Sequence, residues 1–166
     1  MRSTLLVALS LALLAAGPCP AASADPVPSA APTTAAAPSA CGFHLSVAAT
    51  KLWKAFGGEG GSLGCPTADE TDASPSPHGS QSRVTPFGDR GAIFVLASGP
   101  AAGQAVAITN CYPLYYQYGG SSGWLGLPLD NAVNTPDGQK QVFEGGDMRF
   151  GRALQTCDAT AGADEP

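Results

Sequence analysis

Apolar residues recur with helical spacing in two stretches of the chain. The first stretch contains Ala49, Leu52, Trp53 and Phe56. Intervals of three and four residues predict a helix of about three turns, which Ser46 caps and Gly57 ends. The second stretch contains Leu114, Tyr115 and Tyr118. A helix is expected there that begins after Asn110, tolerates Pro113 in its first turn and ends at Gly119.

Shorter apolar runs between turn residues predict strands. Residues 83–87 and 92–96 flank a Gly-Asp-Arg-Gly turn, and residues 140–143 and 148–150 flank a Glu-Gly-Gly-Asp turn. Each pair is therefore expected to form a β-hairpin. Residues 105–108 form one more apolar run, which predicts a strand leading into the second helix.

Each predicted helix is followed by the same glycine motif. Gly-Gly, four further residues and Leu-Gly-x-Pro occur twice, at an offset of 62 residues. The motif residues are Gly57, Gly58, Leu63, Gly64 and Pro66 in the first copy, and Gly119, Gly120, Leu125, Gly126 and Pro128 in the second. A left-handed glycine closes a helix and proline prevents its continuation, so the motif predicts a tight elbow. A unit of this size cannot bury its apolar face alone, so each copy should need its neighbour.

The fold class that these elements predict is α+β. We expect two tandem helix-elbow-β-hairpin repeats in one small domain, with repeat 1 over residues 41–104 and repeat 2 over residues 105–157. A loop rich in serine and proline over residues 72–82 should be exposed. Polar residues 158–166 predict a flexible tail.

The N-terminal residues predict export. Residues 1–24 contain a basic start, an apolar middle and a final Ala-Ser-Ala, the pattern of a cleaved signal peptide. The apolar run is too short to span a bilayer comfortably, so the protein is not expected to span a membrane. Residues 25–40 are mostly Pro, Ala, Ser and Thr and predict a disordered linker. Pro18 before Cys19 fits a lipid-attachment site poorly, but an anchor at this cysteine stays an alternative.

Four cysteines remain after the signal: Cys41, Cys65, Cys111 and Cys157. An even number in an exported chain implies two disulfides. Pairing Cys41 with Cys65 and Cys111 with Cys157 would close each repeat on itself, and we favour it. Pairing across the repeats, Cys41 with Cys157 and Cys65 with Cys111, stays open. The sequence has no Cys-x-x-Cys pair and no histidine at ligand spacing, so no metal is expected.

Charge and motifs argue against nucleic-acid binding and catalysis. Without Arg2, seven Lys and Arg face 13 Asp and Glu, and the basic residues are scattered, so nucleic acid is not an expected partner. The sequence has no Gly-x-Ser-x-Gly motif, and disulfides should consume the thiols. His44 and His78 are each expected to be exposed and without a role. We therefore expect no catalytic residues and no cofactor.

The repeated motif resembles that of the LGFP repeat family. Thr67-Ala68-Asp69-Glu70 and Phe143-Glu144-Gly145-Gly146 extend the resemblance, which covers roughly residues 43–157. Proteins with this repeat are typically secreted and cell-wall-associated in actinobacteria. The resemblance implies a non-catalytic module that binds wall glycan, such as arabinogalactan or peptidoglycan. The second copy departs from the family where residues 129–132 replace Thr-x-Asp-Glu.

Two other functions stay open beside glycan binding. One is a secreted module that binds another envelope protein, which would require an exposed apolar patch. The other, less favoured, is a cell-wall hydrolase or esterase.

The glycan site is expected around the elbows. Trp124 and Tyr116 replace the polar Ser62 and Lys54 of the first copy, so their rings should be exposed and able to stack on sugar faces. Sugar hydroxyls would then donate to Asp69, Glu70 and Asp130. Asp69 and Glu70 have a second interpretation, as residues that cap local backbone. Trp53 and Tyr115, at equivalent positions in the two copies, are expected in the core.

Overall fold

The structure is a computed structural model that describes residues 39–162. The predicted signal peptide, its Cys19 and the linker as far as residue 38 lie outside the described residues, as do residues 163–166. Within residues 39–162, neither helix has the length and apolar character that crossing a membrane requires.

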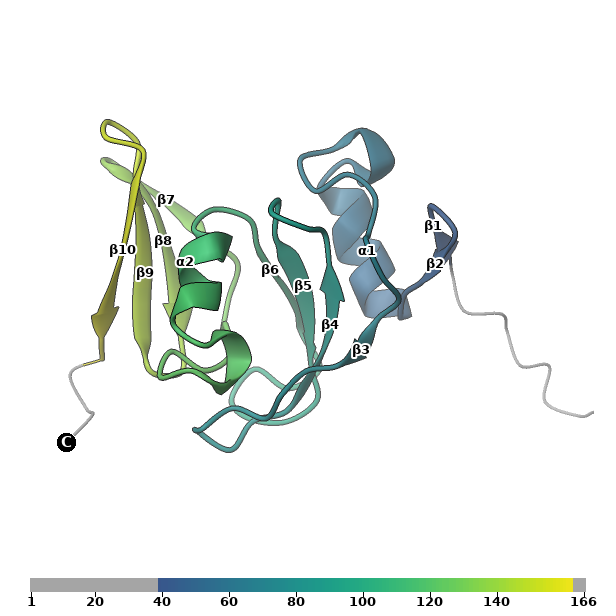
Figure 1. Ribbon diagram of the computed structural model, residues 1–166, viewed down its shortest axis with the longest axis horizontal. Helices are drawn as coiled ribbons and strands as arrows, with labels where there is room; N and C mark the ends of the chain where they lie inside the picture. The colour runs from purple at the N-terminus through teal and green to yellow at the C-terminus, as the bar shows by residue number, and fades with distance from the viewer. Residues whose placement is uncertain (1–38, 163–166) are drawn as a thin grey trace, which may run out of the picture. The chain divides into compact units, whose positions relative to one another are not determined.

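The described chain is a mixed α+β fold of two helices and three small sheets (Figure 1). The helices are α1 (Val47–Ala55) and α2 (Tyr112–Gln117), and the 3-10 turns are η1 (Gly58–Gly60) and η2 (Gly120–Ser122). The strands are β1 (Ser39–Ala40), β2 (Phe43–His44), β3 (Thr71–Asp72), β4 (Ser82–Pro86), β5 (Ala92–Leu96), β6 (Ala105–Ile108), β7 (Val133–Thr135), β8 (Gly138–Phe143), β9 (Gly146–Gly151) and β10 (Thr156–Ala161).

Both predicted hairpins are present, and each is extended into a four-stranded antiparallel sheet. The first sheet has the order β3-β4-β5-β6 and the second has the order β10-β9-β8-β7, while β1 and β2 pair separately. The added strands β3 and β7 are two and three residues long. Strands this short leave no readable apolar alternation, which explains why the sequence did not reveal them.

The structure corrects three predicted boundaries. Strand β6 pairs with β5, so residues 105–108 belong to the first sheet, which their expected place at the start of the second unit did not anticipate. Strand β10 pairs with β9 through Ala161, so the tail prediction is wrong for residues 158–161. Backbone hydrogen bonds to β9 order this polar strand. At the other end, Ser39 and Ala40 pair with β2, so the predicted linker overlaps the fold by two residues.

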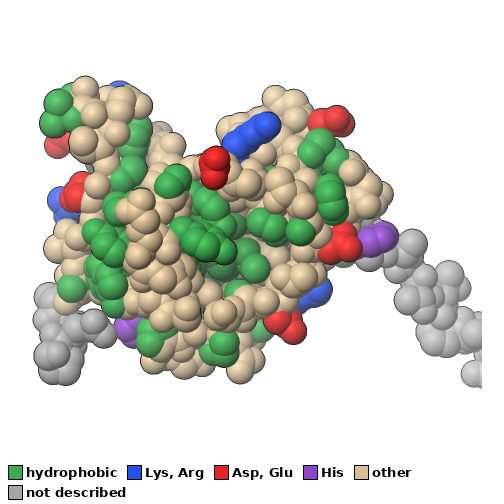
Figure 2. Space-filling model, viewed as in Figure 1, with side chains coloured by type: hydrophobic (Ala, Val, Ile, Leu, Met, Phe, Trp, Pro, Cys, Tyr) green, Lys and Arg blue, Asp and Glu red, His purple; other side chains and the backbone are tan. Residues whose placement is uncertain are grey.

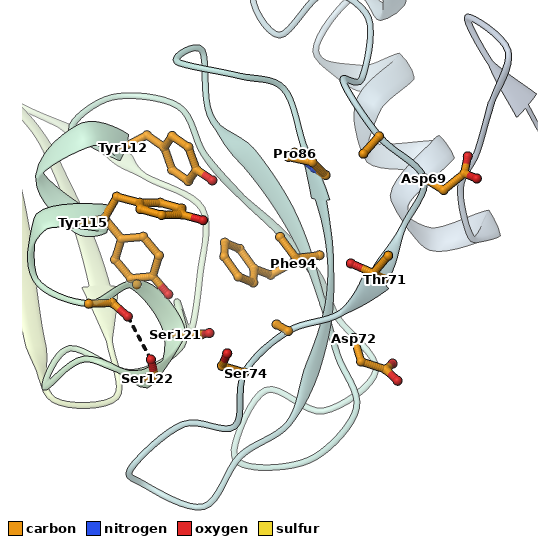
Figure 3. Close-up of a pocket in the computed structure, with 16 residues that line it drawn as sticks. Asp69, Thr71, Asp72, Ser74, Pro86, Phe94, Tyr112, Tyr115, Ser121 and Ser122 are labelled. Carbon is orange, nitrogen blue, oxygen red and sulfur yellow. Dashed lines mark hydrogen bonds between the residues drawn. The ribbon is translucent and has the colours of Figure 1, made fainter.

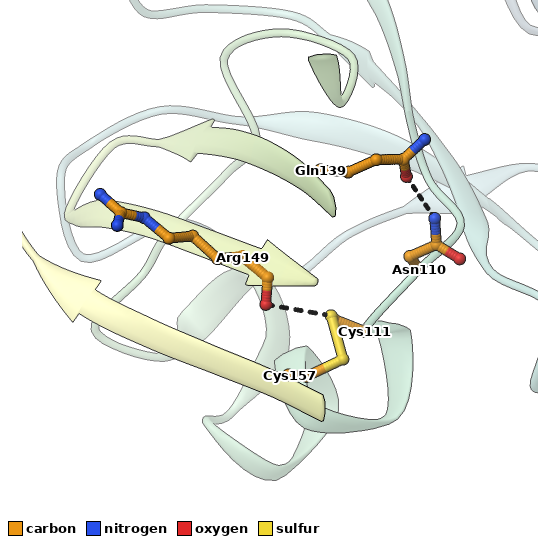
Figure 4. Close-up of a disulfide and its surroundings, with 5 residues drawn as sticks. All are labelled: Asn110, Cys111, Gln139, Arg149 and Cys157. Carbon is orange, nitrogen blue, oxygen red and sulfur yellow. Dashed lines mark hydrogen bonds between the residues drawn. A yellow bond between two sulfur atoms is a disulfide. The ribbon is translucent and has the colours of Figure 1, made fainter. Parts of the chain in front are cut away.

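The two helices begin differently. Ser46 caps α1 as predicted, because its Oγ accepts a hydrogen bond from the Ala49 N–H at 3.2 Å. Asn110 does not cap α2. Cys111 occupies that position in the left-handed conformation, with φ of 61°, and the Asn110 side chain donates to Gln139 Oε1 (Figure 4).

Two disulfides join Cys41 to Cys65 and Cys111 to Cys157, which confirms the favoured pairing and makes the cross-repeat pairing wrong. Figure 4 shows the second of these bonds. The sulfurs of Cys41 and Cys65 lie within 4.8 Å of a Glu59 oxygen. Because these sulfurs are bonded to each other, they offer no thiolate to a metal ion.

Alternate residues of the first sheet enter two separate cores. Ile93 packs with Trp53 of α1 in one core, whereas Phe94 packs with Tyr115 of α2 in the other. The second core also contains Phe143 of the second sheet. Helix α1 therefore covers one face of the first sheet, and α2 lies between its other face and the second sheet (Figure 1).

Candidate functional site

The two elbows have matching backbone conformations. Gly57 and Gly119 close their helices with φ of 92° and 93°, and Gly64 and Gly126 turn the chain with φ of 67° and 68°. Positive φ in this range strains residues other than glycine, which explains the residue type at these positions.

A buried aromatic side chain holds each elbow against its helix. The Trp53 Nε1–H donates to the Gly64 carbonyl at 2.7 Å, and the Tyr115 hydroxyl donates to the Gly126 carbonyl at 2.9 Å. Trp53 is 8% exposed and Tyr115 is 1% exposed, so the predicted burial of both residues is confirmed.

A cleft of about 500 Å³ opens between α2 and the first sheet. One wall consists of α2 and η2, which contribute Tyr112, Tyr116 and Ser121. The opposite wall consists of the segment before β4 and the face of β4 and β5, which contribute Ser74 and Phe94. Figure 2 shows hydrophobic side chains gathered in a hollow on this side of the molecule. Residues 68–94 and residues 112–122 therefore form the cleft together.

The aromatic side chains in the cleft support one another. Tyr112 and Tyr116 have ring centroids 5.7 Å apart in an edge-to-face arrangement, and Phe94 meets Tyr115 in the same way at 5.9 Å. The Tyr112 hydroxyl points across the cleft toward the strand wall (Figure 3), whereas the buried Tyr115 hydroxyl donates to the Gly126 carbonyl. Tyr116 is 69% exposed, so its ring is accessible to a ligand.

The tyrosine hydroxyls stay protonated over a wide pH range. Burial raises the pKa of Tyr112 to about 12, with a further contribution from Tyr116. Burial also raises the pKa of Tyr115, assisted by Tyr112, Glu144 and Tyr116. A neutral phenol both donates and accepts a hydrogen bond, which suits it to a ligand rich in hydroxyl groups.

Asp69 and Glu70 accept hydrogen bonds from the backbone just before α1. Asp69 Oδ1 accepts a hydrogen bond from the His44 N–H at 2.7 Å, and Glu70 Oε2 accepts one from the Ser46 N–H at 2.7 Å. Asp69 is exposed and lines the cleft. Glu70 is 7% exposed, and Arg83 Nη1 lies 3.4 Å from its other oxygen, Oε1. Both carboxylates therefore bond backbone N–H groups, but these lie 25 and 24 residues away and not in the local turn that the capping interpretation expected. Glu70 has little access to a ligand.

Trp124 and Asp130 lie outside the cleft lining, although Tyr116 lies within it. Trp124 is half-buried, with its ring centroid 5.6 Å from that of Tyr118. Asp130 is exposed, and its Oδ1 accepts a hydrogen bond from the Asn131 N–H at 2.7 Å. Of the five residues expected to form one site, Tyr116 and Asp69 therefore line the same cleft, whereas Glu70, Trp124 and Asp130 do not.

Sequence reasoning missed most of the cleft. Tyr112 and Tyr116 are four residues apart, and this spacing alone places them on one side of a helix. Phe94, Ser74 and Ser121 give no comparable signal, because they join the tyrosines only through the packing of α2 on the first sheet.

A second polar cluster surrounds Glu144. Its Oε2 accepts hydrogen bonds from Ser76 Oγ at 2.5 Å and from the Leu127 N–H at 2.8 Å. His78 Nε2 lies 2.9 Å from the Trp124 carbonyl oxygen. These contacts join the loop before β4 to the second elbow. The loop was expected to be exposed, but Ser76 is only 6% exposed because the loop folds beneath that elbow.

The environment of Glu144 favours its ionised form. Burial by itself raises the pKa of this carboxyl group, but the Leu127 N–H, the Ser76 and Ser80 hydroxyls and His78 together lower the pKa below its usual value. The imidazole of His78 bonds a backbone carbonyl, and Ser76 Oγ accepts from the His78 backbone N–H. Ser76 thus has no hydrogen bond to the imidazole that could activate it as a nucleophile.

Comparisons with known proteins add no relatives, since no protein-family model and no curated protein matches the chain. The resemblance to the LGFP repeat therefore remains a prediction from the motif residues. What the cleft binds has to be inferred from its geometry.

Proposed function

We propose that this protein is a non-catalytic exported module that binds glycan of the actinobacterial cell envelope. The observation that carries the proposal is the cleft of about 500 Å³, in which tyrosine rings and serine hydroxyls face the same space. Sugars present apolar C–H faces and many hydroxyl groups, so they match rings and neutral hydroxyls together. The volume is within the range of about 300–1,000 Å³ that is typical of ligand sites.

Two features of the sequence support a ligand in the cell envelope: the repeated glycine motif and the predicted signal peptide. We propose that the two segments are tandem repeats of the LGFP kind, because their elbow glycines and elbow-bonding aromatic residues correspond in conformation and role. The predicted signal peptide would export the chain, and the linker would let the folded part reach polymer at a distance. Arabinogalactan and peptidoglycan are the candidate ligands.

Absence of catalysis is part of the proposal. A hydrolase needs a nucleophile with a base, or two carboxyl groups placed around the reacting bond. In the part of the chain that the structure describes, the Ser76, His78 and Glu144 cluster is tied to backbone groups of the second elbow. Ser76 is also buried, so a substrate has no access to its hydroxyl.

Sedimentation with purified, protease-treated wall fractions tests the proposal. Wild-type protein should pellet with at least one glycan fraction. Tyr116→Ala should weaken binding about five-fold, because loss of one aromatic contact costs about 1 kcal/mol. Tyr118→Ala is the matched control, since Tyr118 ends the same helix and is 37% exposed but does not line the cleft.

The outcomes separate the function from its site. Wild-type protein that stays in the supernatant with every glycan fraction would contradict glycan binding. Equal pelleting of wild type and Tyr116→Ala would leave glycan binding intact and contradict the cleft. Trp124→Ala then tests the elbow surface that the sequence suggested, and we expect it to bind like wild type.

A further inference from the structure

We infer that the cleft between α2 and the first sheet selects uncharged sugar rings and discriminates against polymers that carry carboxylate or phosphate groups. This inference rests on the proposed glycan binding and narrows the class of ligand. The supporting observations are the charged residues around the cleft and the directions in which their side chains point.

Apart from Asp69 and Asp72, the residues that line the cleft are uncharged. Tyr112 and Ser121 occupy one wall, and Ser74 and Phe94 occupy the other. The residues that line the cleft include no lysine or arginine. An anionic group that entered would lose its hydration without gaining a cationic partner, which is unfavourable.

The charged residues beside the cleft are acidic and already bonded. Asp69 and Asp72 contribute to its lining, but their carboxylates turn away from the tyrosines (Figure 3). Asp69 accepts the His44 N–H, and Asp72 Oδ1 lies 3.9 Å from Arg83 Nε. Among the residues that line the cleft, a negatively charged polymer would therefore meet only charges of its own sign.

Strand alternation keeps the nearby cation out of the cleft. Thr71 pairs with Val84 and Asp72 pairs with Arg83, and successive residues of a strand face opposite sides of the sheet. Because Val84 lines the cleft, Arg83 is directed to the opposite face, where its guanidinium contacts Glu70. The Arg83 charge therefore lies across the sheet from the tyrosines and Phe94.

Matched polymers test this selectivity with the full exported chain. The probes are a neutral galactan, the carboxylated polymer polygalacturonate, and purified peptidoglycan, whose peptides carry carboxylates. The neutral galactan should bind about ten-fold more tightly than polygalacturonate. Its affinity should change by less than about two-fold between about 0.05 M and about 0.5 M salt, because no ion pair contributes to binding.

A gain of charge provides a second test that does not depend on loss of binding. Ser74→Lys places an ammonium group in the cleft and should raise the affinity for polygalacturonate about five-fold or more at low salt. Ser62→Lys is the matched control. Ser62 is exposed in the first motif and does not line the cleft, so this variant reports only the effect of net charge.

Each outcome bears on the inference. Tighter, salt-sensitive binding of polygalacturonate or peptidoglycan that Tyr116→Ala weakens would overturn the neutral selectivity and retain glycan binding in the cleft. If the two lysine variants raised the affinity for polygalacturonate equally, the inference would also be overturned, because the charge of the cleft would then not determine which polymer binds. Failure of the wild-type protein to bind any of the polymers would contradict both this inference and the proposed function.

Discussion

Single hydrogen-bonding side chains connect distant parts of this small fold. Glu144 is the clearest case, because its carboxylate accepts hydrogen bonds from the Ser76 hydroxyl and the Leu127 N–H at once. Ser76 lies 68 residues from Glu144 in sequence. Hydrogen bonds to an ionised group are stronger than neutral ones, so this residue should stabilise the contact between the β4 loop and the second elbow.

Replacement of Glu144 should change how stability depends on pH. Its folded pKa is lowered from the usual value of 4.5, so the carboxylate stabilises the fold above that value, and this stability is lost as pH falls through the folded pKa. Glu144→Gln should therefore unfold at lower urea than wild type at pH 7. The difference should shrink in acid, below the usual pKa.

Urea midpoints at several pH values measure this effect, with the exposed Glu59→Gln as control. The control should follow the wild-type pH profile throughout. A Glu144→Gln deficit of constant size from pH 7 into acid would mean that shape, and not ionisation, accounts for the loss.

At the scale of elements, each elbow depends on one glycine beyond those in the recognised motif. Gly61 and Gly123 occupy equivalent positions, four residues after the helix-closing glycines. A Cβ on Gly61 would lie 1.8 Å from the Phe56 carbonyl oxygen, and one on Gly123 would lie 1.7 Å from the Tyr118 carbonyl oxygen. The turn brings the backbone back over the end of its own helix, so no side chain fits there.

Gly61→Ala should destabilise the fold by about 3 kcal/mol, because backbone has to move to admit the methyl group. Gly60→Ala is a control one residue away, where a Cβ would meet nothing within 4 Å. That change should alter stability by less than about 1 kcal/mol. Urea unfolding of both variants checks the contrast, and similar losses would show that the close approach is not the cause.

At the scale of the whole molecule, α2 packs against both four-stranded sheets. Phe94 of the first sheet and Phe143 of the second pack on Tyr115, which is almost fully buried. The Cys111–Cys157 disulfide joins the residue before α2 to β10, and the Cys41–Cys65 disulfide joins the turn after β1 to the first elbow. One cross-link therefore holds the N-terminal end of the described chain to the first elbow, and the other holds its C-terminal strand to the start of α2.

Removal of either disulfide should destabilise the protein by about 3–4 kcal/mol. The hydrophobic core is small, and each bond lowers the conformational entropy of the unfolded chain. The paired change Cys111→Ala with Cys157→Ala should cost slightly more than Cys41→Ala with Cys65→Ala, because its sequence separation is 46 against 24 residues. Thermal and urea unfolding measure both. Variants as stable as wild type would show that packing alone supports the fold.

The sequence by itself determined the local elements that depend on local chemistry. The cap at Ser46, the left-handed closure at Gly57 and the β4–β5 hairpin all follow from residues that are near one another in the chain. The favoured cysteine pairing was also confirmed, although spacing alone left an alternative.

Only the tertiary structure decided where the candidate site lies. Tyr116 lines the cleft while Trp124 packs on Tyr118, although both were expected in one site because each replaces a polar residue of the first copy. The strands β3, β7 and β10 form because partner strands satisfy their backbone groups, and not through their own apolar pattern. The cleft likewise exists because α2 packs on the first sheet, and a contact between such distant residues leaves no local mark in the sequence.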